Sequence, residues 1–221
     1  MKTIALLQTR MRSSRCPGKA VRFLNGDPLV WHIYRRLLGC HEVDQVVCAI
    51  GDIDPEPILK VCDEYGMYWR VGPEKNLLSR LIEAASHHHA DAVVRITGDC
   101  LFHDPIRVDE QVKAFTDAWP VYAGLANWPR RSVSEGLDCE VYAMSTLVAL
   151  DHDSFCPRED FATYAIKKGI VDSYVSDHPT VGAEVHMSID TEEDFTRAEK
   201  VLKEIGNGSF RYETALEAWT R

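Results

Sequence analysis

Short apolar runs alternate with amphipathic segments along the first half of the chain, and this alternation predicts an α/β fold. The apolar runs, which we expect to be buried strands, are Thr3–Leu7, Gln45–Ile50, Tyr68–Val71 and Asp91–Ile96. Between them, apolar residues recur at helical spacing in Pro28–Leu38, Pro55–Tyr65 and Leu77–His88. Strands that alternate with helices in this way favour a mostly parallel sheet. Ligands of such sheets bind beyond the carboxyl ends of the strands.

The second half has a less regular pattern. We expect a helix from Pro105 to about Ala118, an irregular stretch at Ala123–Ser134 and a strand at Asp138–Ala143. The later elements expected are helices at Ser145–Asp151, Arg158–Lys168, Glu192–Ile205 and Tyr212–Trp219, and strands at Ile170–Ser176 and Val185–Ile189. No linker is long enough to divide the chain, so residues 1–221 are expected to form one domain.

Composition narrows the function. The 221 residues include 25 lysines and arginines against 34 aspartates and glutamates, a formal net charge of −9. This sign disfavours a general nucleic-acid-binding protein. No apolar run approaches the roughly 18 residues of a membrane span. The cysteines, seven in number and widely spread, are typical of reduced thiols. We therefore expect a cytoplasmic protein with no nucleic-acid or membrane partner.

A basic loop follows the first strand. Gln8–Lys19 holds three arginines, a lysine and two serines but no acidic residue. Fixed cations and hydroxyl or N–H donors without a competing carboxylate suit a diphosphate or triphosphate. The loop is not a Walker A motif, because Ala20 follows Gly18-Lys19 where that motif needs Ser or Thr. A merely solvated basic loop is the alternative, which the position at a strand's carboxyl end disfavours.

The loop resembles the Q-A-R-x-G-S-x-R-L-P-G-K signature of the spore-coat polysaccharide F-type (SpsF-like) cytidylyltransferases, which are related to CMP-Kdo and CMP-sialic acid synthetases. Arg12 stands where that family usually has Gly, and Cys16 where it has Leu. Further motifs follow in the family's order along nearly the whole chain. The resemblance implies a single-domain GT-A-like (nucleotide-diphospho-sugar transferase) fold, with a Rossmann-like mixed, mostly parallel sheet and helices on both faces.

Two aspartates are expected to bind a metal ion. Arg95–Pro105 resembles the family's R-I-T-G-D-C-P-L-I-D-P, which implies that Asp99 binds Mg²⁺. A carboxylate at a strand's carboxyl end can indeed reach a metal-bound phosphate. Asp104 is better explained as a helix N-cap. Ser188–Phe195 resembles T-V-D-T-P-E-D-L, so Asp190 would be the second metal ligand, with the neighbouring Thr191 capping the next helix.

Weaker matches suggest further contacts. Gly136–Tyr142 resembles G-L-D-V-E-V-F, and Asp138 and Glu140 alternate along a strand, so they point the same way. The resemblance implies that they face the sugar or nucleotide; a salt bridge between subunits is the alternative. Arg158 begins a match to R-E-H-V in which Asp160 replaces His. Arg80 ends a match to L-D-R in which Ser79 replaces the acid.

The resemblance implies an Mg²⁺-dependent cytidylyltransferase that joins CTP to an acidic sugar, giving a CMP-sugar and pyrophosphate. In this hypothesis Arg10, Arg15 and Lys19 neutralise the β- and γ-phosphates. The nucleotide-binding residues expected are Gln8, Arg10, Ser13, Ser14, Arg15, Lys19, Arg80, Thr97, Gly98 and Asp99. The expected catalytic residues are Arg10, Arg15, Lys19 and Asp99, the substrate-binding residues Asp138, Glu140 and Arg158, and the metal ligands Asp99 and Asp190. A homodimer is expected, because relatives commonly pair through the region corresponding to 123–160, which would also face the substrate.

Three alternatives remain open. The chain could be another nucleotidylyltransferase that uses a sugar-1-phosphate or a phosphonate. It could be a glycosyltransferase of the same fold, with Asp138-Cys139-Glu140 as a loose D-x-D motif and no release of pyrophosphate. The third possibility is a non-catalytic nucleotide-binding subunit, which the replacements at Arg12, Ser79 and Asp160 would suit.

Overall fold

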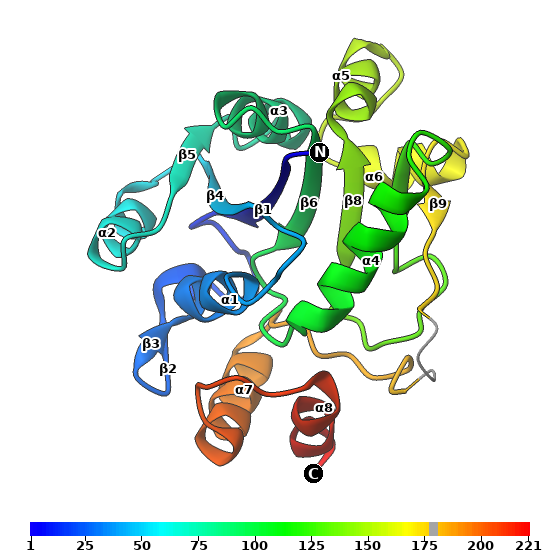
Figure 1. The fold of residues 1–221 in the computed structure, drawn as a ribbon. Coiled ribbons are helices and arrows are strands. Elements are labelled where there is room, and N and C mark those ends of the chain that lie inside the picture. The colour runs from blue at the N-terminus through cyan, green and yellow to red at the C-terminus, as the bar shows by residue number, and fades with distance from the viewer. Residues whose placement is uncertain (177–180) are drawn as a thin grey trace.

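The computed structural model describes residues 1–176 and 181–221. A seven-stranded sheet forms its centre, in the order β5-β4-β1-β6-β8-β7-β9 (Figure 1). The strands are β1 (Thr3–Thr9), β4 (Gln45–Gly51), β5 (Trp69–Gly72), β6 (Ala92–Thr97), β7 (Gly124–Ala126), β8 (Cys139–Ala143) and β9 (Asp172–Ser173). The neighbours from β5 to β6 pair in parallel, whereas β8 runs antiparallel to both β6 and β7. The predicted α/β fold with a mixed, mostly parallel sheet is confirmed.

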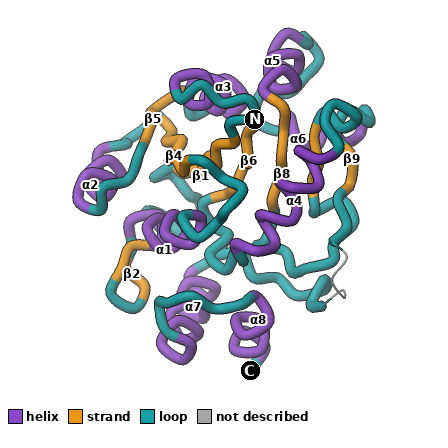
Figure 2. The backbone as a smooth tube through the Cα atoms, in the orientation of Figure 1, coloured by secondary structure: helices purple, strands orange, loops and turns teal. Residues whose placement is uncertain are grey.

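Helices cover both faces of this sheet (Figures 1 and 2). One face packs against α1 (Leu29–Leu37), α2 (Glu56–Glu64), α4 (Pro105–Asp117), α7 (Glu192–Ile205) and α8 (Tyr212–Thr220). The other packs against α3 (Leu77–His87), α5 (Met144–His152) and α6 (Phe161–Lys167). Because β1 is covered on both sides, Ile4–Leu7 are all fully buried, which explains their uninterrupted apolar run.

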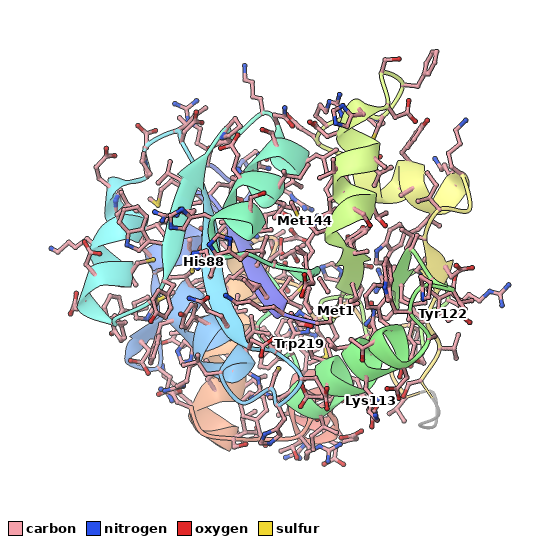
Figure 3. The ribbon with its side chains drawn as sticks, turned by 45° about the horizontal axis from the view of Figure 1, so that its top comes forward. Met1, His88, Lys113, Tyr122, Met144 and Trp219 are labelled. Carbon is pink, nitrogen blue, oxygen red and sulfur yellow. The ribbon has the colours of Figure 1, made fainter. Side chains whose placement is uncertain are left out.

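The amino ends of β1 and β6 and the carboxyl end of the antiparallel β8 meet at the edge opposite the ligand-binding edge. The carbonyl of Lys2 accepts hydrogen bonds from the N–H groups of Asp91 and Ala92, and the carbonyl of Asp91 accepts one from Met144. Figure 3, which draws the side chains as sticks, labels Met1 and Met144. The polar residues after β1 and β6 therefore share the opposite, carboxyl edge, where ligands bind in folds of this kind.

Two predicted helix caps are confirmed. The side chain of Asp104 accepts a hydrogen bond from the N–H of Ile106 and caps α4. Thr191 and Asp194 form a reciprocal capping box at the start of α7, where each side chain binds the other residue's backbone N–H. The box fixes where α7 begins and therefore the place of Asp190, the residue just before it.

The structure differs from the sequence predictions in several places. The stretch expected to be irregular contains β7, and the chain between β1 and α1 carries a short helix, η1 (Lys19–Val21), and a hairpin of β2 (Phe23–Leu24) and β3 (Asp27–Pro28). The strand predicted at Val185–Ile189 is wrong. Its only ladder contact among the described residues is an isolated bridge between Glu135 and His186. The strand predicted at Ile170–Ser176 is reduced to β9.

All seven cysteines are buried, free thiols. Within residues 1–176 and 181–221, the structure contains no helix long and apolar enough to cross a bilayer.

Candidate active site

A pocket of about 400 Å³ opens at the carboxyl ends of β1 and β6. Four segments that are far apart in sequence line it: the basic loop after β1, the turn after β6, the residues before β8 and those before α7. Its lining residues are Gln8, Thr9, Arg10, Arg12, Ser13, Ser14, Arg15, Lys19, Ala20, Thr97, Gly98, Asp99, Cys100, Glu135, Gly136, Asp138, Ser188 and Asp190. Most of the predicted nucleotide-binding residues and both predicted metal ligands are among them.

The ammonium group of Lys19 lies between the two predicted metal ligands. Its Nζ is 3.2 Å from Oδ2 of Asp99 and 3.9 Å from Oδ1 of Asp190. The same Nζ donates a hydrogen bond of 2.5 Å to the carbonyl of Ile189. Arg15 reaches Oδ1 of Asp190 from the other side, at 2.9 Å. Both carboxylates therefore converge on one position that already attracts a cation.

Asp99 is held in its ionised form. Burial would raise its pKa, but the charge of Lys19 and the hydrogen bonds from Thr97 and Lys19 outweigh burial, so the pKa lies below the ordinary value. The Thr97 hydroxyl donates to Oδ1 at 2.6 Å, while Lys19 binds Oδ2. Each carboxylate oxygen thus has its own donor, and the negative charge persists at neutral pH.

Two glycines allow these segments to approach. A side chain at Gly98 would place its Cβ 2.7 Å from the carbonyl oxygen of Gln8, so the turn after β6 can pack against β1 only without one. Gly136 has φ +99°, and a Cβ there would lie 2.6 Å from the carbonyl carbon of Met187. A hydrogen bond of 3.0 Å from the N–H of Ile189 to the carbonyl of Asp99 joins the segment before α7 to the turn after β6.

The two carboxylates suit a magnesium ion. Magnesium takes oxygen ligands and is commonly held by one or two carboxylates together with substrate phosphates. Asp99 and Asp190 supply such oxygens next to a loop rich in phosphate-binding groups. Among the described residues, no group of three or more His, Cys, Asp or Glu side chains is placed to hold a metal ion. The residues present therefore fit an ion shared with a nucleotide.

Asp138 lines the pocket, as predicted, but it is already paired. Arg131 donates to both of its carboxylate oxygens, at 3.2 Å for the longer bond. Burial raises the pKa of Asp138, and the hydrogen bond and charge of Arg131 act against that rise. Its position beside Gly136 leaves it facing the cavity with its charge largely neutralised.

Glu140 does not line the pocket, which corrects the expectation that it faces the substrate. Its side chain is only 5% exposed and accepts hydrogen bonds from Arg95 at 2.6 Å, Trp128 at 2.9 Å and Tyr142 at 2.5 Å. The alternative salt bridge between subunits does not fit either, because the partner, Arg95, belongs to the same chain. The Nε of Arg95 in turn donates to Oε1 of Gln8 at 2.9 Å.

Arg80 and Arg158 also lie outside the pocket lining. Arg80 is 2% exposed and packs against Gly51 and Gly72, and burial lowers its pKa to about 10. Arg158 donates to the carbonyls of Leu150 and Asp151 at the end of α5, at 3.1 and 2.7 Å. This corrects the expectation that both arginines contact a ligand, because neither lines the pocket and the guanidinium of Arg158 binds backbone carbonyls instead.

Some lining residues escaped the sequence analysis. Ser188 lies in the stretch wrongly predicted as a strand, and Glu135 lies between the predicted irregular stretch and the predicted strand at Asp138–Ala143, where no element was assigned. The neighbouring Gly136 is the one signal of a close approach there. His186, with Nε2 3.4 Å from Oδ2 of Asp190, was missed for the same reason. Arg12, noted only as a replacement, lies on the rim and pairs with Asp54 at 3.4 Å, both side chains being well exposed.

The α/β fold with its mixed, mostly parallel sheet is that of the nucleotidyltransferases with a GT-A-like fold. Residues 4–155 match the family model described as "Cytidylyltransferase". The chain therefore belongs to the cytidylyltransferase family, an enzyme family of the nucleotidyltransferase class.

Curated relatives agree with this assignment. The spore coat polysaccharide biosynthesis protein SpsF of Bacillus subtilis is 23% identical over 219 residues, which cover 91% of this chain and 86% of that protein. The 3-deoxy-manno-octulosonate cytidylyltransferase of Geotalea daltonii is 27% identical over 148 residues. That match covers 66% of this chain but only 57% of the relative.

Solved structures show the same fold. A cytidylyltransferase from Leptospira borgpetersenii superposes with a TM-score of 0.91 at 25% identity, covering 100% of this chain and 94% of that one. The CMP-2-keto-3-deoxy-manno-octonic acid synthetase complexed with CTP superposes with a TM-score of 0.71 at 16% identity, covering 92% of this chain and 99% of that one. The second likeness concerns the fold alone.

Proposed function

We propose that this chain transfers CMP from CTP to an acidic sugar in surface polysaccharide biosynthesis, with release of pyrophosphate. The observation that carries the proposal is the position of Lys19 between Asp99 and Asp190, in a pocket whose rim bears Arg10, Arg12 and Arg15. A site with fixed cations on one side and two convergent carboxylates on the other suits a magnesium–triphosphate complex.

The basic loop would bind the phosphates. Arg10, Arg15 and Lys19 neutralise the β- and γ-phosphates, and the Ser13 and Ser14 hydroxyls add donors. Within the described residues Arg10 makes no ion pair, and it lines the pocket, so its guanidinium is available to an anion. A hydroxyl oxygen of the sugar attacks the α-phosphorus, the bond between the α-phosphorus and its bridging oxygen breaks, and pyrophosphate leaves. The hydroxyl proton passes to solvent, and fixed charges stabilise the transition state.

Asp99 and Asp190 are the residues that would hold Mg²⁺. The ion, when bound, neutralises charge that develops on the phosphate oxygens. The low pKa of Asp99, in which the charge of Lys19 and two hydrogen bonds overcome the effect of burial, keeps one ligand ionised over a wide pH range. Arg15 and Lys19 would release the Asp190 oxygen that they now share and turn to the phosphates.

The acceptor is inferred from the relatives, since 3-deoxy-manno-octulosonate is an acidic sugar. Arg12 is a cation on the rim that could pair with a sugar carboxylate, and Glu135 and Ser188 offer acceptors and a donor for its hydroxyls. Asp138 would face the acceptor with its charge compensated by Arg131. A sugar-1-phosphate or a phosphonate would use the same cations.

The glycosyltransferase alternative has little structural support. Its loose D-x-D motif requires that Asp138 and Glu140 both present oxygens to a metal ion. Asp138 is occupied by Arg131, and Glu140 is buried beneath the pocket with three donors of its own. A non-catalytic nucleotide-binding subunit remains as an outcome of the test below.

The experiment follows pyrophosphate release from CTP and Mg²⁺ with a panel of acidic sugars, sugar-1-phosphates and phosphonates. We expect turnover with an acidic sugar, and a loss of about 10²-fold or more in Asp99→Asn and Asp190→Asn. The matched control is Asp117→Asn, which removes an exposed carboxylate of α4 and should keep full activity. Release with none of the acceptors, or full activity in both site variants, would contradict the proposal.

We propose, further, that residues 1–221 act as one catalytic domain and that the protein forms a homodimer through the region 123–160. Phe155, in the turn between α5 and α6, is 84% exposed, an unusual position for a large apolar side chain. Sedimentation equilibrium should give twice the mass of the 25.0 kDa chain. Phe155→Ser should shift the equilibrium toward the monomer if this turn belongs to the interface.

A further inference from the structure

Three polar side chains form a continuous chain on one face of the sheet, and only the first reaches the pocket. Gln8 of β1, Arg95 of β6 and Glu140 of β8 belong to adjacent strands, with Arg95 and Glu140 directly opposite each other in the antiparallel register. Leu6 and Val93 lie two residues before Gln8 and Arg95 on the same strands, so they point to the same face. They pack against α3, α5 and α6. The chain of residues therefore runs from the pocket into an otherwise apolar core.

The buried end of this chain is rigid. The side chains of Arg95 and Glu140 are 13% and 5% exposed. Glu140 accepts bonds from Trp128 and Tyr142 as well as from Arg95, so its carboxylate is fixed from several directions. Burial lowers the pKa of Arg95, but the charge of Glu140 more than compensates and raises it, so Arg95 stays charged. The guanidinium can therefore only donate hydrogen bonds.

This arrangement fixes which end of the Gln8 amide faces the ligand. The Nε of Arg95 donates to the amide oxygen of Gln8 at 2.9 Å. A rotated amide would set its NH₂ group against that N–H, donor against donor, so rotation is disfavoured. The Gln8 NH₂ makes no hydrogen bond within the described residues, and Gln8 is one of the residues that line the pocket. The pocket thus presents a donor at Gln8, and the amide cannot readily exchange it for an acceptor.

A neutral donor at this place suits a nucleobase better than a phosphate. The cations that serve phosphates come from the loop after Gln8. One of them, Lys19, binds the carbonyl of Ile189, a residue of the core on the opposite face of the sheet from the Gln8 side chain. Cytosine N3 is an acceptor, whereas uracil N3 carries a hydrogen. A fixed NH₂ group can bind the first but is opposed by the second, because two donors then meet without an acceptor.

On the basis of the proposed function, we propose that Gln8 donates from its amide to N3 of cytosine, and that Arg95 and Glu140 are positioning residues that lock this amide and so select CTP over UTP. Arg95 and Glu140 touch no substrate in this scheme. They act by preventing the rotation that would let Gln8 accept the N3–H of uracil.

The decisive variant is Gln8→Glu. Its carboxylate keeps an acceptor for Arg95 but offers the pocket a second acceptor in place of the donor. The readout is the ratio of kcat/KM for CTP to that for UTP with the same acceptor, and the ratio of their Kd values by calorimetry with Mg²⁺. We expect the ratio to fall about tenfold or more, the effect of one exchanged hydrogen bond. Repulsion between the added carboxylate and the triphosphate cancels in this ratio, because both nucleotides carry the same triphosphate.

Arg95→Met tests the hydrogen bond that fixes the amide, because it leaves Gln8 intact but free to rotate. The ratio of CTP use to UTP use should then fall toward the value expected when the amide can either donate or accept. If Arg95→Met does not fold, Arg95→Lys keeps a cation beside Glu140 but removes the guanidinium Nε that binds Gln8, and it should lower the ratio in the same direction. The matched control is Glu213→Gln, which breaks another ion pair of a largely buried arginine, Arg107, outside this pocket. It should leave the ratio unchanged.

The outcomes separate this inference from the proposed function. If the wild type releases pyrophosphate from CTP but Gln8→Glu lowers CTP and UTP use equally, Gln8 is only structural and the inference is overturned. A wild type that binds CTP and UTP equally well overturns it too. If the wild type binds CTP selectively but releases no pyrophosphate, the catalytic proposal fails, while the lock is still judged by the Kd ratio.

Discussion

Lys19 and Asp99, eighty residues apart in the sequence, form a 3.2 Å ion pair inside the pocket. The lysine comes from the short helix η1 and the aspartate from the turn after β6. Each has a further partner there: Lys19 binds the carbonyl of Ile189, and Asp99 accepts from Thr97. The pair therefore joins the basic loop, the sheet edge and the segment before α7, and a change in either residue should affect all three.

Lys19→Ala should weaken CTP binding and slow the reaction. The variant removes a cation beside two carboxylates, so an incoming triphosphate would meet uncompensated negative charge. We expect a KM for CTP raised about tenfold or more and a kcat lowered by about 10²-fold. Steady-state kinetics with CTP as the varied substrate measures both values. Lys113→Ala, on the exposed surface of α4 (Figure 3), is the control and should match the wild type. Equal kinetics in the two variants would remove Lys19 from the phosphate site.

The ionised state of Asp99 should contribute a pH-dependent part of the stability. Burial alone would raise its pKa, but the charge of Lys19 and the hydrogen bonds of Thr97 and Lys19 hold it below the ordinary value. Because the folded pKa is depressed, this contribution is complete above the unfolded pKa of about 3.9 and disappears as the pH falls through the folded value.

The test compares urea unfolding of the wild type and Asp99→Asn between about pH 3 and pH 7, a range that includes the unfolded pKa of about 3.9. We expect the difference in unfolding free energy to be constant near neutral pH and to shrink toward the acidic end. Subtracting the two proteins cancels the titration of the carboxylates they share. A difference that grows on acidification would mean that Asp99 is destabilised, rather than stabilised, in its charged form.

The sequence predicted the front half of the fold well, because its strands are buried on both sides. A continuous apolar run such as Ile4–Leu7 indicates a buried strand even though apolar and polar residues do not alternate in it. Gly66 after α2 and Gly98 before Asp99 mark places where the chain changes direction. The later strands β7 and β9, three and two residues long, are too short to produce a period. Their pairing depends on distant strands, which local sequence does not encode.

The candidate site was predicted in part for a similar reason. Asp99 follows the buried strand β6, and Asp190 precedes a helix whose capping residues are visible in the sequence, so their convergence could be expected. The alternation of Asp138 and Glu140 indicates a shared side of a strand, but it does not say whether that side meets a cavity or a core. In the structure the first residue reaches the pocket and the second is buried by Trp128 and Tyr142.

Gly136→Ala should destabilise the protein and disturb the pocket. The glycine has φ +99°, which a side chain rarely adopts, and a Cβ would press into the backbone at Met187 and Ser188. We expect a loss of about 1–3 kcal/mol or more, together with lower activity because Asp190 lies two residues beyond Ser188. Urea unfolding measures the loss. Gly208→Ala is the control: a Cβ added there would meet no atom within 4 Å, and a change within about 0.5 kcal/mol is expected.

Arg158→Ala should lower stability but leave catalysis unchanged. The guanidinium donates to the carbonyls of Leu150 and Asp151, which lie at the carboxyl end of α5, and it also pairs with Asp151 at 3.2 Å. Helix carboxyl ends leave carbonyls without partners and attract cations. We expect a loss of about 1 kcal/mol, the usual size for such contacts. Thermal unfolding should reveal it.

The same variant tests the role that sequence resemblance suggested for Arg158, namely contact with the sugar. If the side chain acts only on α5, the KM values for CTP and for the acceptor should equal those of the wild type. Arg130→Ala, an exposed neighbour of Trp128 and Arg131 in the chain, controls for the loss of one positive charge. A raised acceptor KM in Arg158→Ala alone would show that the arginine reaches the substrate in a conformation different from this one, and would restore the original assignment.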